Sequence, residues 1–245
     1  PYAQESRGLG DVYKRQVHPP STNNEVPVII DAASEARKTV AEAISVAINK
    51  TKRDNVVISS GFNPNTKEVV NTLVDRSKFH VNYVDLVDYL FPEDYVFSED
   101  DAAFVVSLPH YEGSAQDLTS IVQNAKAAGV ITICYADPSM LGILKSPGSM
   151  GFDIVVAEGQ SMGSSLSFGG PTVGWFATRK ELARLVPGRI IGESRDSNNT
   201  KTYVMTLRAR EQDIRREKAS SNICTNQTLN AVGSTIHLSW LGPEG

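Results

Sequence analysis

The sequence lacks the features by which nucleic-acid-binding and membrane proteins are recognised. A formal net charge of −4 leaves no excess of lysine and arginine that could bind a phosphate backbone. The most apolar stretch, residues 130–136, is far shorter than the roughly 18 residues that cross a bilayer. No succession of charged, apolar and small residues indicates a signal peptide. We therefore expect no nucleic-acid partner and no membrane association.

Cysteine and histidine are scarce. The two cysteines, Cys134 and Cys224, are too few for a disulfide framework, and the four histidines do not have the spacing of zinc ligands. We expect no metal site and a reducing, cytoplasmic location. Cys134 falls in the middle of an apolar run, which predicts a small, buried side chain.

Glycine-rich phosphate-binding motifs are also missing. No G-x-G-x-x-G follows an expected strand and no G-x-x-x-x-G-K-[ST] occurs, which argues against dinucleotide and nucleoside triphosphate binding. Lysine is missing over a long segment as well, because none lies between Lys145 and Arg179. That segment contains apolar runs at residues 153–157 and 174–178 with a glycine-rich loop between them, which predicts strand, loop and strand.

The rest of the chain alternates between helix and strand patterns. Apolar residues at helical spacing predict a helix at residues 31–50 and a second helix that starts with Asn65 as its cap and Glu68 reaching back to it. A third helix is expected after the capping residues 114–117 and ends at Gly129. A buried strand is expected at residues 56–60, and further strands at residues 80–84, 103–107 and 130–136.

Strand, helix and strand units of this length form right-handed crossovers, so their strands lie side by side in a mostly parallel sheet with helices on both faces. The sequence therefore predicts an α/β fold with three layers in the order α-β-α. Ligands of such sheets bind at the carboxyl ends of the strands. The segments at those ends are residues 60–61, 108–113, 137–138 and 158–163.

The chain divides into three expected parts. Residues 1–16 show no apolar periodicity, and we expect a non-native or disordered tail there. Residues 17–30 are expected to form a linker, and residues 31–245 to form one large domain. Within that domain, the acidic stretch at residues 85–101 is expected to be a loop on the surface.

A charged cluster at residues 207–218 contains five positive and three negative side chains, so much of its charge can pair within the cluster. If this segment were one helix, Arg208, Gln212 and Arg215 would share a face. Two interpretations stay open: a solvated, self-paired surface, or arginines that recognise carboxylate or phosphate groups or fix a neighbouring subunit. The candidate interface or substrate-facing residues are Arg208, Arg210, Arg215, Arg216, Lys218 and Asn222.

Four segments together resemble a known family. They are residues 159–163 (GQSMG), 166–171 (LSFGGP), 187–193 (PGRIIGE) and 210–225 (REQDIRREKASSNICT). These segments closely resemble the glycine dehydrogenase P-protein of the glycine cleavage system, and within that family its subunit 1 (alpha). The resemblance extends over residues 31–245, and the last segment is too long and specific to agree by chance.

This resemblance implies the large domain of a fold-type I pyridoxal-phosphate-dependent transferase, as a fragment without the small C-terminal domain of the family. It also implies a heteromeric enzyme, glycine dehydrogenase (decarboxylating), that decarboxylates glycine and passes the aminomethyl group to lipoylated H-protein. In the family, a lysine of subunit 2 holds the pyridoxal phosphate. Gln160 and Ser161 occupy about that place here, and neither can form the covalent link. We expect a degenerate pocket, no catalytic or cofactor-binding residue in this chain, and a cofactor held by subunit 2.

Asp137 has two interpretations. It follows an expected strand, at the position where the active half of the family pairs a carboxylate with the pyridine nitrogen. A cap for the turn that begins at Pro138 is the commoner role at this spacing, and with no ring anchored nearby we assign Asp137 that structural role. Two other functions stay open: a self-sufficient pyridoxal-phosphate-dependent transferase of another class, using Lys145 or Lys180, or a non-catalytic scaffold.

Overall fold

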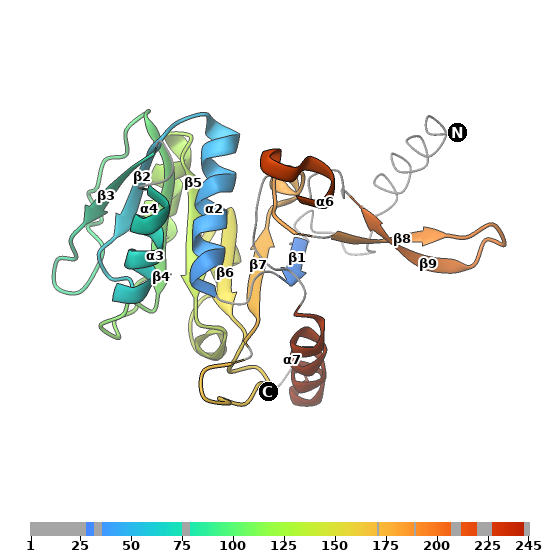
Figure 1. Ribbon diagram of the computed structural model, residues 1–245. Coiled ribbons are helices and arrows are strands. Elements are labelled where there is room, and N and C mark those ends of the chain that lie inside the picture. The colour runs from blue at the N-terminus through green and yellow to red at the C-terminus, as the bar shows by residue number, and fades with distance from the viewer. Residues whose placement is uncertain are drawn as a thin grey trace.

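A seven-stranded sheet forms the centre of the protein in a computed structural model that describes residues 28–31, 36–74, 79–170, 172–188, 190–206, 212–219 and 227–242. The strand order is β1-β7-β6-β5-β4-β2-β3 (Figure 1). The strands are β1 (Val28–Asp31), β2 (Asn55–Ser59), β3 (His80–Val84), β4 (Asp101–Leu108), β5 (Ile131–Ala136), β6 (Ile154–Glu158) and β7 (Gly174–Thr178). A separate hairpin of β8 (Ile190–Arg195) and β9 (Lys201–Thr206) projects away from this sheet.

The strands from β3 to β6 run parallel to one another, whereas β7 is antiparallel to both β6 and β1. This mostly parallel arrangement with helices on both sides confirms the expected three-layer α/β fold. The α-helices are α2 (Ala36–Thr51), α3 (Pro64–Val74), α4 (Thr119–Ala127), α5 (Pro147–Met150), α6 (Gln212–Arg215) and α7 (Thr228–Leu241). Short 3-10 turns are η1 (Pro138–Gly142), η2 (Lys180–Leu182) and η4 (Arg216–Lys218).

Two hydrophobic cores lie on opposite faces of the sheet. Strand β4 shows the division, because all of its residues are buried and their side chains alternate between the cores. Ala103 and Val105 pack in the core that contains α2, whereas Phe104 and Val106 pack in the core that contains α4. Burial on both faces explains the continuous apolar run at residues 102–106. The two buried polar residues near the ends of the strand are hydrogen-bonded: Asp101 accepts the Ser98 backbone N–H and the Ser107 hydroxyl donates to the Pro109 carbonyl.

Helix boundaries differ from expectation at two places. Strand β1 lies partly within the expected linker at residues 17–30 and ends at Asp31, so the first helix does not begin there; its described part starts at Ala36. The second helix begins with Pro64, and the side chain of Asn63, not Asn65, accepts the Asn65 backbone N–H at 2.9 Å. Proline is favoured at the first helical position because it has no N–H to satisfy, which places the cap one residue before it.

The acidic stretch at residues 85–101 is only partly a surface loop. Phe91 and Phe97 are buried and their rings lie 4.8 and 5.2 Å from that of Phe104 in β4. These two aromatic side chains fill part of the α4-side core, while the acidic residues between them face outward. The prediction of a surface loop was wrong for these two aromatic residues. The many acidic side chains around them make the segment polar on average, although Phe91 and Phe97 occupy core positions.

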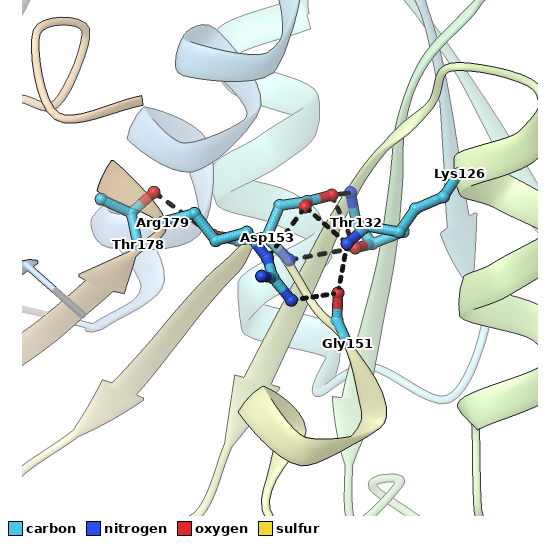
Figure 2. A network of polar contacts seen from close by, with 6 residues as sticks. All are labelled: Lys126, Thr132, Gly151, Asp153, Thr178 and Arg179. Carbon is cyan, nitrogen blue, oxygen red and sulfur yellow. Dashed lines mark hydrogen bonds and ion pairs between the residues drawn. The ribbon is translucent and has the colours of Figure 1, made fainter. Parts of the chain in front are cut away.

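A carboxylate at the amino ends of β5 and β6 ties neighbouring strands together (Figure 2). Asp153 accepts hydrogen bonds from the Thr132 backbone N–H at 3.0 Å and hydroxyl at 2.9 Å. Its second oxygen pairs with Lys126 Nζ at 3.0 Å and Arg179 Nε at 3.4 Å. Both cations also donate to the Gly151 carbonyl oxygen. Because a buried charge requires partners, this network fixes β5, β6, the end of β7 and α4 relative to one another.

We predict that Asp153→Ala lowers the free energy of unfolding by about 3 kcal/mol, because it leaves two cations and the Thr132 donors without their common acceptor. Glu193→Ala is the control, since it removes an exposed carboxylate that also pairs with a lysine. We expect that control to cost at most about 1 kcal/mol. Denaturant unfolding measures both, and equal losses for the two variants would contradict the assigned role of Asp153.

Candidate functional site

Three loops leave the carboxyl ends of β4, β5 and β6, which are adjacent in the sheet. In folds of this kind such loops form the ligand site. They bring His110, Asp137, Gln160 and Ser161 to the carboxyl-terminal edge of the sheet, where these parallel strands end. This edge is opposite the Asp153 network, because that network lies where β5 and β6 begin.

The loop after β6 is closed by its own hydrogen bonds. A Cβ at Gly159 would lie 2.6 Å from Nε1 of Trp175, so only glycine fits, and the Gly159 N–H donates to the Val173 carbonyl at 2.7 Å. The Gln160 side-chain amide donates to the Ser164 carbonyl at 2.8 Å, and its backbone N–H to a Glu158 carboxylate oxygen at 3.1 Å. The Gln160 amide is thus used to hold the loop in shape.

These residues do not fit a covalently bound aldehyde cofactor. Ser161 is exposed and has no amine, the Gln160 amide is not nucleophilic, and the sequence offers no lysine between Lys145 and Arg179. The fold provides the end of the sheet at which such a cofactor would sit, but the loop after β6 contains no amine that could capture it.

Asp137 has the capping role that spacing favoured. One carboxylate oxygen accepts the Ser139 backbone N–H at 2.9 Å and the Ser139 hydroxyl at 2.7 Å, which caps η1. The side chain is exposed. This geometry is that of a turn cap, the structural role assigned to Asp137 from its spacing.

Neither of the two lysines considered for a self-sufficient enzyme lies in the loop after β6. Lys145 donates to the Thr119 hydroxyl at 2.8 Å and pairs with Asp117 at 3.2 Å, at the start of α4. Hydrogen bonds from the Thr119 hydroxyl and backbone N–H, and then from Lys145, lower the pKa of Asp117 to about 2. Lys180 follows β7, whose antiparallel direction places it at the opposite edge from the Gln160 loop.

His110 was missed by the sequence analysis. It is 2% exposed in the loop after β4, and neither ring nitrogen has a hydrogen-bond partner among the described residues. A Cβ at Gly61 would lie 2.6 Å from Nδ1 of this ring, so the histidine requires glycine at the end of β2. Burial lowers the pKa of His110, and the negative charge of Glu112 opposes that effect. A single histidine in a loop has no periodic signal that would have identified it.

The charged cluster is not one continuous helix in its described part. Helix α6 ends at Arg215, and Arg216 has a φ of 52°, which breaks the helical path before η4. Arg215 and Arg216 are exposed, as either interpretation of the cluster requires. Lys218 lies in η4. Three further candidates, Arg208, Arg210 and Asn222, lie outside the described residues, as do residues 1–16.

Cys134 is fully buried in β5, and this confirms its expected packing role. Burial raises the pKa of its thiol, which makes it a poor nucleophile at neutral pH. Within the described residues, histidine, cysteine and carboxylate side chains form no group of three that could hold a metal ion. No helix in the same part of the chain combines the length and apolar character needed to cross a membrane.

Solved structures with the same architecture define the class of protein. The crystal structure of a glycine decarboxylase (P-protein) of the glycine cleavage system matches with a TM-score of 0.83 and 33% identity, over 99% of this chain and 54% of that one. A cysteine desulfurase from Escherichia coli matches at a TM-score of 0.59 and 12% identity over 98% of this chain and 57% of its own, which supports the fold alone. The fold is that of fold-type I pyridoxal-phosphate-dependent enzymes.

Sequence comparisons identify the family more narrowly. The family model described as glycine cleavage system P-protein matches residues 29–245. A probable glycine dehydrogenase (decarboxylating) subunit 1 from Desulforamulus reducens is 41% identical over 88% of this chain and 50% of its own length. Its counterpart from Staphylococcus haemolyticus is 43% identical over 84% and 46%. The chain belongs to the glycine cleavage system P-protein family, and it spans about half the length of these curated relatives.

We predict that burial of His110 makes the stability of the protein depend on pH. The folded-state pKa is lowered, so the unfolded chain binds the proton more readily. Stability is therefore full above the unfolded pKa of about 6.5 and decreases as the pH falls below that value toward the folded pKa.

Denaturant unfolding at about pH 7.5 and about pH 5.5 tests this prediction. His110→Gln should lose less stability than wild type between the two conditions, because glutamine does not titrate. His80→Gln is the control, since His80 is exposed on β3. An identical loss for wild type and His110→Gln would show that the imidazole does not contribute.

Proposed function

We propose that this chain belongs to subunit 1 of glycine dehydrogenase (aminomethyl-transferring) in the glycine cleavage system. In this role it supports glycine decarboxylation and transfer of the aminomethyl group to lipoylated H-protein. The proposal is supported by relatives named as probable subunit 1 of glycine dehydrogenase (decarboxylating) at 41–43% identity. A P-protein of known structure with the same fold also supports it.

The observation that carries the proposal is the missing amine in the loop after β6. Decarboxylation of an amino acid on pyridoxal phosphate requires a covalent link that lets the ring accept electrons. Gln160 and Ser161 cannot supply it, and Gln160 is instead bonded to the Ser164 carbonyl. We therefore assign the chemical step to a partner, subunit 2, which holds the cofactor through its own lysine.

The contribution of this chain is then to shape and complete its partner. It has the same fold as a cofactor-binding subunit but a loop that is stable without a ligand. We propose a heteromer of subunits 1 and 2 in the cytoplasm, where the buried free thiol of Cys134 remains reduced. Exposed arginines, among them Arg215 and Arg216, are candidates for contacts with the partner or its substrate.

We predict that the isolated chain forms no specific covalent adduct with pyridoxal phosphate. After incubation with the cofactor and reduction with borohydride, peptide mass spectrometry should find no stoichiometric phosphopyridoxyl group at any one residue. Subunit 2 treated in parallel should carry one. A stoichiometric adduct at Lys145 or Lys180 would instead establish the self-sufficient transferase.

Co-expression with subunit 2 from the same genome tests the heteromer. Glycine–bicarbonate exchange should require both chains, because only together do they provide the cofactor and the complete site. Subunit 2 that reaches full exchange activity alone, or two chains that form no stable complex, would favour the scaffold alternative.

Arg215→Ala combined with Arg216→Ala should weaken assembly or activity, since lost charge-assisted hydrogen bonds cost about 1.5–3 kcal/mol each. The matched control is Lys50→Ala with Lys52→Ala, which removes two exposed positive charges at the end of α2. Titration of subunit 2 with each variant measures the effect. If the arginine variant has wild-type affinity and exchange activity, both arginines belong to a solvated surface and not to an interface.

A further inference from the structure

The His110 side chain lies where three segments of the chain meet, at the carboxyl ends of β2, β3 and β4. Its own loop follows β4, and its ring packs against Gly61, which follows β2. A Cβ at Gly61 would lie 2.6 Å from Nδ1 of the ring and 2.9 Å from Cδ1 of Leu86, which follows β3. One almost fully buried imidazole therefore joins segments that come from three different strands.

This enclosure suits only the neutral form of the ring. Neither ring nitrogen has a hydrogen-bond partner among the described residues. A neutral imidazole brings one N–H and one acceptor nitrogen into the enclosure, whereas the protonated ring brings two N–H donors and a positive charge. Burial of an unpaired charge costs far more than burial of a neutral polar group. Protonation therefore favours a conformation in which the ring has left the enclosure.

The surroundings of the enclosure suit the charged form. Residues 79–125 contain no lysine or arginine, and the first charged residue after Gly61 is Lys67. The segments around the ring carry four carboxylates, all exposed: Asp85, Asp88, Glu112 and Asp117. Among these, Glu112 is the charge that counteracts the effect of burial on the pKa of His110. A protonated ring that moves outward thus gains carboxylate partners that it lacks inside.

The segments over the ring are strained and are held by few side chains. Asp88 and Tyr89 have φ values of 51° and 65°, in the left-handed region that non-glycine residues disfavour. The Ser114 hydroxyl donates to the Tyr89 carbonyl, and the Gln116 side chain makes two hydrogen bonds with the Phe91 backbone, at 3.0 and 3.1 Å. Strained backbone of this kind is found at switch regions. Residues 86–91 and 109–116 therefore form one cover that can open while the sheet stays intact.

We propose that His110 is an acid-sensitive latch: the neutral ring holds the cover of residues 86–91 and 109–116 closed over the carboxyl ends of β2 and β4, and protonation releases it toward Glu112 and opens the cover. Buried histidines that become charged near pH 6 act in this way in other pH-dependent switches. The inference does not depend on the proposed function. It also differs from a general loss of stability in acid, because the opening is confined to the cover.

Hydrogen–deuterium exchange of the full chain at about pH 7.5 and about pH 5.5 tests the latch, after correction for the intrinsic effect of pH on exchange. A released imidazole has an ordinary pKa of about 6.5, so two pH units across that value should increase opening by about tenfold. We expect this increase in peptides from residues 86–91 and 109–116. Peptides from β5, which is buried in the middle of the sheet, should keep their protection.

Three variants identify the group that titrates. His110→Gln should abolish the pH dependence of the cover, because glutamine does not gain a proton. Glu112→Gln replaces an exposed side chain and should reduce the increase, because the released ring loses its carboxylate partner. His80→Gln, in the exposed part of β3, should behave as wild type. Far-UV circular dichroism at pH 7.5 checks that each variant folds.

The possible outcomes are distinct. An increase of less than about twofold in the cover would show that the ring is not released, and would overturn the latch. An equal increase in the β5 peptides would also overturn it, because His110 would then gain its proton only when the whole domain unfolds. Should His110→Gln fail to fold, Glu112→Gln still decides: the same increase as in wild type would contradict release of the ring toward this carboxylate.

Discussion

The Asp153 carboxylate is the interaction on which the arrangement of the sheet depends. It joins the beginnings of β5 and β6 to α4 and to the residue after β7, so one carboxylate holds three consecutive strands and a helix together. Once these strands are fixed at one edge, the loops at the other edge start from fixed positions. The loop after β6 is then closed by hydrogen bonds from the Gly159 N–H to the Val173 carbonyl and from the Gln160 amide to the Ser164 carbonyl. A buried charge thus sets the geometry of a site that lies at the far end of the strands.

The fold is that of pyridoxal-phosphate-dependent enzymes, and the loop after β6 contains no lysine. Gln160 bonds within its own loop and Asp137 caps a 3-10 turn, so both side chains have structural roles. His110 is buried nearby with its ring packed against Gly61. The edge therefore keeps its shape through side chains that hold the protein rather than a ligand. The proposed function therefore depends on surfaces that meet another polypeptide.

Much of this could be predicted from the sequence. Strands β2, β4, β5 and β6 are largely buried apolar runs, and β3 is a short strand at the edge of the sheet, so the positions of these strands and the parallel sheet followed from the sequence pattern. The missing lysine was equally visible. Features that depend on distant contacts were not: β1 is four residues long and is defined by pairing with β7, and Phe91 and Phe97 enter the core from an acidic loop. His110 becomes a candidate only because it is buried in the structure, and no local sequence pattern predicts that burial.

The closure of the Gln160 loop also affects how this chain is maintained in a cell. Enzymes that hold a cofactor gain stability from it by mass action, so their folded fraction declines when the cofactor is scarce. The Gln160 amide and the Gly159 N–H already have their partners in the protein itself. Under the proposed function the cofactor is held by the partner subunit, so the folded fraction of this chain gains nothing from cofactor binding by mass action.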